Sequence, residues 1–315
     1  MKRALIFPGQ GSQAVGMGKA LAEAFPSARA VFDEVDAALS QKLSALMWEG
    51  PAEELTLTAN TQPALMAVSI AAIRVLEAEA DLDLKRDVAF VAGHSLGEYS
   101  ALAAAGSLSI ADTARLLRIR GDAMQSAVAV GRGAMAALLG LEYDVALAVA
   151  REAAQGEVCD AANDNGGAQV VVSGHRSAVE RAVAIAQARG AKRAVMLPVS
   201  APFHCALMAP AAQTMRQALA SVSMKPPVVR VVANVEARAI TAPDDIRAAL
   251  VRQVTGTVRW RESVGYMAAE GVDRFYEVGA GKVLTGLVKR IAPGASAAAV
   301  GLPADIAAFK ASLQG

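Results

Sequence analysis

The residues with the clearest chemical potential lie in the pentapeptide Gly93-His94-Ser95-Leu96-Gly97, which has the pattern G-x-S-x-G. An apolar run at residues 88–92 predicts a buried strand before it, and residues 96–105 predict a helix after it. In this context the pattern is typical of a nucleophile elbow, a sharp turn that exposes a serine hydroxyl at the edge of a sheet. The glycines allow strand and helix to approach closely because they carry no Cβ. A chance match in an alanine- and glycine-rich chain is the alternative, and the order of the elements favours the elbow.

A serine hydroxyl is a weak nucleophile and needs a base. The chain offers three histidines, His94, His175 and His204. His204 is favoured because it lies between a predicted strand and a predicted helix, where α/β proteins often place catalytic groups. A helix-capping or buried structural role fits His204 about as well. His94 is expected to point the opposite way around the elbow, and His175 to start a surface helix.

A carboxylate for a Ser-His-Asp triad is missing near His204, because residues 194–225 contain neither Asp nor Glu. A backbone carbonyl or a side-chain amide could orient the histidine instead. At the start of the predicted helix, the backbone N–H of Leu96 is expected to lie beside any oxyanion that forms at Ser95.

Two further segments could contribute to a site around Ser95. Arg120 lies in a helical run with apolar neighbours, which indicates that an arginine here faces inward. A buried arginine needs an anionic partner, either in a structural ion pair or in a bound ligand. The loop at residues 9–13 is rich in glycine and could present Gln10 and backbone N–H groups to the pocket, but it lacks the spacing and the lysine of a P-loop.

Composition excludes several classes of function. The 315 residues carry a net charge of +1, which argues against a strongly basic nucleic-acid binder. Two isolated cysteines and three histidines make a poor metal site, so no metal is expected. The charged first residues run into a predicted strand rather than a signal peptide, and residues 55–73 predict a core helix rather than a membrane span. We therefore expect a cytoplasmic protein with no membrane partner.

The order of predicted elements indicates an α/β fold. Apolar strands alternate with helices at both ends of the chain, which favours a mainly parallel sheet covered by helices. Between them, the order strand, helix, strand, strand, helix, strand predicts a ferredoxin-like (βαββαβ) unit. We predict a body formed by residues 1–128 and 198–315 and an inserted subdomain at residues 129–197.

Several segments together resemble the malonyl-CoA:acyl carrier protein transacylase family of bacterial fatty-acid synthesis. The resemblance covers essentially the whole chain in order. It rests on residues 7–13, 93–99, 120–121, 163–165 with 169–171, 202–204, 251–253 and 277–284.

The resemblance implies an α/β-hydrolase-like body with an inserted ferredoxin-like subdomain. It also implies Ser95 as the nucleophile and His204 as general base and acid, with the backbone carbonyl of Gln253 orienting the histidine. The oxyanion hole would be the N–H groups of Gln10 and Leu96.

Further implied roles concern binding. Arg120 would grip the free carboxylate of the malonyl group, and Asn163 would support the pocket. Phe203 is similar to the residue that marks malonyl selection in related polyketide acyltransferases, so methylmalonyl-CoA is expected to be a poor substrate. Lys289 and Arg290 are expected to contact the acidic carrier protein, although solvated surface charge explains them equally well. The same two interpretations apply to Lys282 and to the pair at residues 192–193.

The expected activity is malonyl transfer from malonyl-CoA to the phosphopantetheine thiol of acyl carrier protein. It would proceed through a malonyl-serine intermediate, without a cofactor and in a monomer. The alternatives are an acyltransferase of polyketide or malonate-decarboxylase metabolism, a serine thioesterase or hydrolase, and a non-catalytic interaction module. A hydrolase would be expected to use an acid in its triad and has no need of Arg120. A non-catalytic module has little support, because Ser95, His204 and Arg120 are all present.

Overall fold

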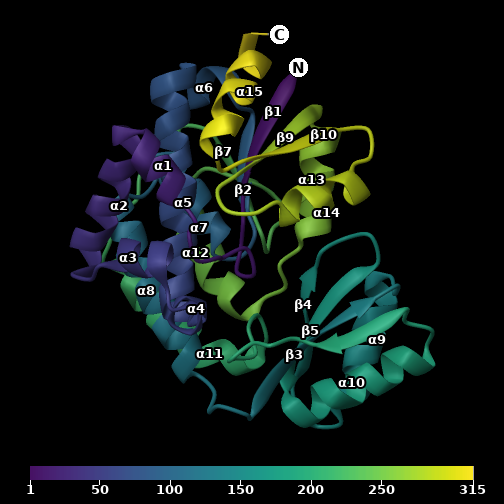
Figure 1. Ribbon diagram of the computed structural model, residues 1–315. Helices are drawn as coiled ribbons and strands as arrows, with labels where there is room; N and C mark the ends of the chain where they lie inside the picture. Colours follow the sequence, from purple (N-terminus) through teal and green to yellow (C-terminus); the bar gives the residue numbers. More distant parts are fainter. Residues whose placement is uncertain (315) are drawn as a thin grey trace.

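The computed structural model describes residues 1–314 and contains two separate sheets (Figure 1). The larger sheet of the described chain has six strands in the order β10-β9-β1-β2-β7-β8. All its neighbours pair in parallel except β7 and β8. The mainly parallel sheet predicted from the sequence is therefore confirmed. Its strands are β1 (Lys2–Phe7), β2 (Phe90–Gly93), β7 (Arg230–Ala233), β8 (Arg238–Ile240), β9 (Val272–Val278) and β10 (Ser296–Val300).

Both faces of the central strands are buried, in keeping with the apolar run at residues 4–7 of β1 and throughout β2. Successive side chains of β1 point to opposite faces. Leu5 and Phe7 pack into one apolar cluster, and Ala4 and Ile6 into another. Because alternate side chains of β1 pack into both apolar clusters, residues 4–7 are completely buried.

Helices cover the two faces. The first cluster is covered by α1 (Lys19–Ala24), α2 (Pro26–Leu39), α3 (Leu43–Glu49), α4 (Ala52–Thr56), α5 (Thr58–Ala80), α6 (Leu84–Asp87), α7 (Gly97–Ala104), α8 (Ile110–Ser126), α11 (Ala209–Ala220), α12 (Pro243–Thr255) and α15 (Pro303–Gln314). On the other face lie α13 (Trp260–Ala269) and α14 (Val283–Ile291). No helix within the described residues is long and apolar enough to cross a membrane. The predicted core helix is α5, which is buried along most of its length.

The smaller sheet lies at the lower right of Figure 1 and is antiparallel throughout. It contains β3 (Gly133–Leu139), β4 (Cys159–Asp164), β5 (Gln169–His175) and β6 (Arg193–Met196) in the order β4-β5-β3-β6. The helices α9 (Tyr143–Ala154) and α10 (Arg176–Ala188) pack with it in an apolar cluster of their own. This is the βαββαβ order that the sequence predicts, and we propose residues 129–197 as its limits.

The other face of the small sheet is turned toward the body. Met135 of β3 and Val171 of β5 belong to the body's main apolar cluster rather than to the cluster with α9 and α10. The space between the body and this face is therefore partly apolar and enclosed by both units.

Several local features are not evident from the sequence pattern. The strand β4 continues through Asn163 and Asp164 after a bulge that follows Ala161, so the chain turns only after Asp164. The segment after His204 begins with a short 3₁₀ helix, η1 (Ala206–Met208), before α11. The short antiparallel strand β8 and the last helix, α15, were not predicted from the sequence.

Candidate active site

Ser95 stands in the turn between β2 and α7 in a left-handed conformation, with φ of 54°. This region is strained for a residue with a side chain and is common at functional sites. The two glycines of the pentapeptide are required because a Cβ at either position would overlap backbone atoms. A Cβ on Gly93 would lie 1.9 Å from the backbone of Gly97, and one on Gly97 would lie 2.3 Å from the carbonyl oxygen of Phe7. The elbow predicted from the sequence is therefore present.

His204 lies beside the serine. Its Nε2 is 2.7 Å from Ser95 Oγ, and its Nδ1 is 2.8 Å from the backbone carbonyl oxygen of Gln253. A carbonyl oxygen only accepts hydrogen bonds, so Nδ1 carries the proton and Nε2 is left to accept from the serine hydroxyl. The structure thus brings together Ser95, His204 and the Gln253 carbonyl in the arrangement expected of a nucleophile, a base and an orienting group.

The environment of His204 favours the neutral imidazole. Its side chain is 4% exposed and φ is 58°. Burial, and next the charge of Arg120, lower the pKa of His204 to about 3. The ring is therefore neutral at pH 7 and free to accept a proton.

Arg120, on α8, also reaches the Ser95 hydroxyl. Its side chain is 1% exposed. Nη2 donates to Ser95 Oγ at 3.1 Å and to Gln253 Oε1 at 2.9 Å, and Nη1 donates to Gln62 Oε1 at 2.7 Å. These partners are neutral, and among residues 1–314 no carboxylate forms a salt bridge with Arg120. Of the two alternatives left open by the sequence, the geometry favours a site for an anionic ligand.

A cavity of about 410 Å³ connects these groups. It lies between the body and the face of the small sheet that α9 and α10 do not cover. The expected site residues that line it are Gln10, Ser95, Leu96, Arg120, Asn163, Phe203 and His204. Gln253 contributes through the hydrogen bonds described above.

Lys289 and Arg290 are exposed at the end of α14, outside this lining. Arg290 Nη2 donates to Gln169 Oε1 at 3.3 Å, and Gln169 does line the cavity. The C-terminal end of α14 therefore stands next to the cavity.

The other two histidines have separate partners. His94 lines the cavity, but its Nε2 lies 2.9 Å from Asn165 Oδ1. His175 stands at the end of β5, where its Nδ1 accepts from the N–H of Val158. His204 is the histidine whose ring nitrogen lies within hydrogen-bond distance of the Ser95 hydroxyl.

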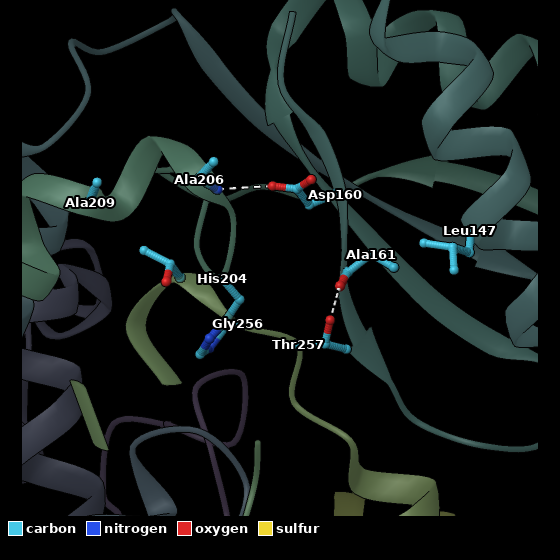
Figure 2. Close-up of a pocket in the computed structure, with 9 residues that line it drawn as sticks. Leu147, Asp160, Ala161, His204, Ala206, Ala209, Gly256 and Thr257 are labelled. Carbon is cyan, nitrogen blue, oxygen red and sulfur yellow. Dashed lines mark hydrogen bonds between the residues drawn. The ribbon is translucent and has the colours of Figure 1, made fainter. Parts of the chain in front are cut away.

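A second hollow lies on the other side of His204 (Figure 2). It has a volume of about 500 Å³ and runs between the body and β4. The Asp160 carboxylate accepts from the N–H of Ala206 at 2.9 Å, and Thr257 Oγ1 donates to the carbonyl of Ala161 at 2.6 Å. These bonds tie the segment after His204 and the segment after α12 to the small sheet, so the position of His204 depends on both units.

Sequence reasoning missed two buried residues that support the elbow. Asn234 Oδ1 accepts from the N–H of Ser95 at 2.8 Å, and its Nδ2 donates to the carbonyl of Gly93 at 2.7 Å. Glu98 accepts from the N–H of Asn234 at 2.9 Å and from Gln253 Nε2 at 2.8 Å. A glutamate in an otherwise uncharged helical run, three residues after the serine, was the available signal for Glu98.

The described residues hold no group of three or more His, Cys, Asp or Glu side chains suited to a metal ion. The chemistry on offer is that of a hydroxyl, an imidazole, an arginine and backbone N–H groups.

Comparisons with known proteins agree with this geometry. The acyl transferase domain family matches residues 4–309. The malonyl CoA-acyl carrier protein transacylase of Escherichia coli K12 is 51% identical over 306 residues, which cover 97% of each chain.

Solved structures extend the similarity to the fold. The acyl-carrier-protein S-malonyltransferase of Bartonella henselae is 56% identical with a TM-score of 0.98, and each chain is covered completely. A malonyl-transacylase solved in complex with its type II PKS acyl-carrier protein is 43% identical with a TM-score of 0.95, covering 99% of this chain and 100% of that one.

The close approach of α7 to β1 gives a first prediction. Gly97→Ala should lower the free energy of unfolding by roughly 1–3 kcal/mol, because the added methyl group overlaps the Phe7 carbonyl. It should also slow the labelling of Ser95 by a fluorophosphonate at least about tenfold, since the elbow must shift. Chemical denaturation and labelling kinetics measure the two effects.

The matched control is Gly265→Ala in α13, where no atom lies within 4 Å of the added Cβ. Alanine should stabilise this helix by up to about 1 kcal/mol and leave the labelling rate unchanged. Equal effects of the two substitutions would contradict the steric explanation.

Proposed function

The chain belongs to the acyl transferase domain family, and on this premise we propose that it transfers a malonyl group from malonyl-CoA to the phosphopantetheine thiol of acyl carrier protein. The observation that carries the proposal is Arg120, a buried cation whose direct hydrogen-bond partners, the Ser95 hydroxyl among them, are all neutral. This position suits an acyl thioester with a second, anionic end.

The first half-reaction begins at Ser95. Its oxygen attacks the thioester carbonyl while Nε2 of His204 takes the hydroxyl proton. The carbonyl of Gln253 holds the imidazole in the required tautomer and stabilises the cation that forms. When the C–S bond breaks, His204 gives the proton to the sulfur, so CoA leaves as a thiol and malonyl-Ser95 remains.

The tetrahedral intermediate carries a negative oxygen that needs donors. We assign this role to the backbone N–H groups of Gln10 and Leu96, two residues that line the cavity together with Ser95. The N–H of Leu96 stands at the start of α7, where helix N–H groups lack partners within the helix. Loss of one such donor costs roughly 10²–10³ in rate.

Arg120 would bind the malonyl carboxylate through its planar, bidentate guanidinium. This pairing also affects the base. The charge of Arg120 is one of the causes that lower the pKa of His204, so a carboxylate that neutralises it raises that pKa toward its ordinary range. A substrate with the carboxylate thus strengthens the base, whereas an acetyl thioester does not.

In the second half-reaction the pantetheine thiol of the carrier protein attacks malonyl-Ser95. His204 takes the thiol proton and returns a proton to the serine oxygen as the ester bond breaks. The two substrates use the same cavity in turn, which predicts ping-pong kinetics. Each step uses groups of this chain and of the two substrates, so we propose that no cofactor takes part.

Two residues of the lining would shape the acyl pocket. Phe203 directly precedes His204 and borders the cavity, where its ring would crowd an α-methyl branch. Asn163 borders the cavity from β4 and would support the bound acyl group.

We propose the end of α14 as part of the carrier-protein contact. Lys289 and Arg290 are exposed, carry positive charge, and stand beside the cavity through the contact between Arg290 and Gln169. The malonyl-transacylase that was solved with its carrier protein supports a direct encounter of this kind.

For the biological setting we propose fatty-acid elongation, carried out by a monomer in the cytoplasm, where CoA thioesters and carrier protein are found. Transfer in polyketide metabolism uses the same chemistry and is the second candidate, supported by the similarity to the type II PKS transacylase. A thioesterase is disfavoured, because it has no need of a buried arginine beside the nucleophile.

The proposal predicts a covalent intermediate. After brief mixing with malonyl-CoA and no acceptor, intact-protein mass spectrometry should show one malonyl adduct on the wild type and none on Ser95→Ala. Holo-acyl carrier protein should discharge the adduct. Fast CoA release without an adduct would indicate a hydrolase, and neither adduct nor release would contradict the malonyl assignment.

Arg120 should decide the choice of acyl group. Arg120→Ala should lower kcat/KM for malonyl-CoA by roughly 100-fold or more and reduce the preference for malonyl over acetyl, because a charge-assisted pair is lost. Arg118→Ala is the matched control, since Arg118 lies on the same helix and donates to Gln41 outside the cavity. An unchanged preference in Arg120→Ala would remove the arginine from the acyl site.

The proposed carrier contact should respond to charge. Lys289→Glu and Arg290→Glu, singly and together, should raise the KM for carrier protein by roughly three- to tenfold at low salt, and the KM for malonyl-CoA should stay the same. Lys310→Glu on α15 makes the same charge change away from the cavity and should have no effect. Equal rises for both substrates would place the two residues outside the carrier interface.

A further inference from the structure

Glu98 is a buried carboxyl group that takes no part in the proposed reaction, although it belongs to the same hydrogen-bonded cluster. Its side chain is 1% exposed. Oε2 accepts from the N–H of Asn234 and from Gln253 Nε2, whereas Oε1 has no hydrogen-bond partner in residues 1–314. A buried carboxylate with one oxygen unsupported is costly as an anion unless a cation lies near.

The nearby cation is Arg120, on the other side of one amide group. Gln253 Oε1 accepts from Arg120 Nη2 at 2.9 Å, and Gln253 Nε2 donates to Glu98 Oε2 at 2.8 Å. Burial raises the pKa of Glu98 and lowers the pKa of Arg120, and the attraction between the two charges partly offsets both shifts. In the free enzyme the buried site therefore holds one cation and one carboxyl group.

Other ionisable groups around Glu98 are few. Tyr99 lies under the Arg120 guanidinium, 5.7 Å from ring centroid to Cζ, and His204 lies beyond Gln253. The strand β2 has no ionisable residue. In the other elements that pack against α7 or contact Glu98, the remaining ionisable residues are at least partly exposed: Lys2, Arg3, Arg74, Glu77, Glu79, Asp112, Arg115, Arg118, Asp122, Arg230, Asp244, Asp245, Arg247 and Arg252.

We propose that Glu98 is the counter-ion of Arg120 in the free enzyme, and that it takes up one proton from solvent when the malonyl carboxylate pairs with Arg120. The inference rests on the proposed function. Two carboxylates around one buried arginine would leave a negative charge uncompensated in a dry site. Protonation of Glu98 leaves one carboxylate paired with one arginine, so the buried charges balance. Oε1 loses no hydrogen bond when the charge of Glu98 disappears, because it has none.

The balance of protons makes this step measurable. In acylation, the proton of Ser95 ends on the CoA thiol, so the reaction neither takes up nor releases a proton while that thiol stays protonated. Any uptake that accompanies adduct formation therefore reflects a group of the protein.

The pH range follows from the charge state of Glu98. Burial raises the pKa of Glu98 to about 7, and a second carboxylate beside Arg120 raises it further. Below pH 7 the group already holds its proton in the free enzyme, so little uptake is expected. Above pH 7 the free enzyme has lost the proton and the loaded enzyme regains it. The KM for malonyl-CoA should then rise by up to about tenfold per pH unit.

The experiment measures protons and adducts together. Wild type and Glu98→Gln are mixed with malonyl-CoA in weak buffer between pH 6 and pH 8. An indicator dye reports proton uptake, and intact mass reports malonyl adducts. In the variant the glutamine oxygen can still accept from Asn234 and Gln253. We expect uptake per adduct to increase toward one proton through pH 7 in the wild type, and to be absent in Glu98→Gln at every pH. Adducts of acetyl-CoA, which lacks the carboxylate, should show no uptake in either protein and correct for ionisation of the CoA thiol.

An independent readout uses the wild type alone. Infrared difference spectra with ¹³C-labelled malonyl-CoA should show a new protonated-carboxyl band that does not shift with the label. Uptake of equal size in wild type and variant, or an adduct without uptake above pH 7, would overturn the inference. Failure to form any adduct would instead contradict the proposed function, so the two failures are distinguishable.

Discussion

The hydrogen bonds that converge on Gln253 hold the candidate active site together. Its backbone carbonyl fixes the His204 imidazole, and its side-chain oxygen accepts from Arg120. The side-chain nitrogen donates to the carbonyl of Ser95 and to the Glu98 carboxylate. With acceptors on one side and a donor on the other, the amide has one workable orientation. The residue is fully buried, so water does not compete for these bonds.

The sequence predicted those parts of the site that are contiguous or rare. The elbow is one pentapeptide with its own flanking elements, and His204 is one of three histidines. Gln253 came from the resemblance alone, because nothing in a backbone carbonyl distinguishes one residue from another in sequence. Glu98 and Asn234 were missed because they meet across 136 positions, and only the packing of α7 against β7 brings them together. Strand β8 escaped prediction because three residues carry too little periodicity.

The site is buried because the body and the small sheet pack against each other and both line the cavity. The small sheet turns one face to its own helices and the other to the body, with Met135 and Val171 in the body's core. Arg120, Glu98 and His204 are buried beside the cavity between the two units, and charges that are shielded from bulk water interact strongly. This explains why the charge of Arg120 affects the pKa of both Glu98 and His204, although it has no hydrogen bond to either side chain. Under the proposed mechanism, selection among acyl groups depends on the charge that the acyl group carries.

The backbone carbonyl and the side-chain amide of Gln253 have different partners, and this has a consequence for how the sequence can evolve. A codon change at this position replaces the amide that restrains Arg120, but every amino acid supplies the peptide carbonyl that aligns His204. The hydrogen bond that orients the His204 imidazole therefore does not need the Gln253 side chain, as long as the end of α12 keeps its path. Acyl preference has no such protection. Under the proposed mechanism, substitutions at position 253 can therefore change the acyl preference while the carbonyl that orients His204 is retained.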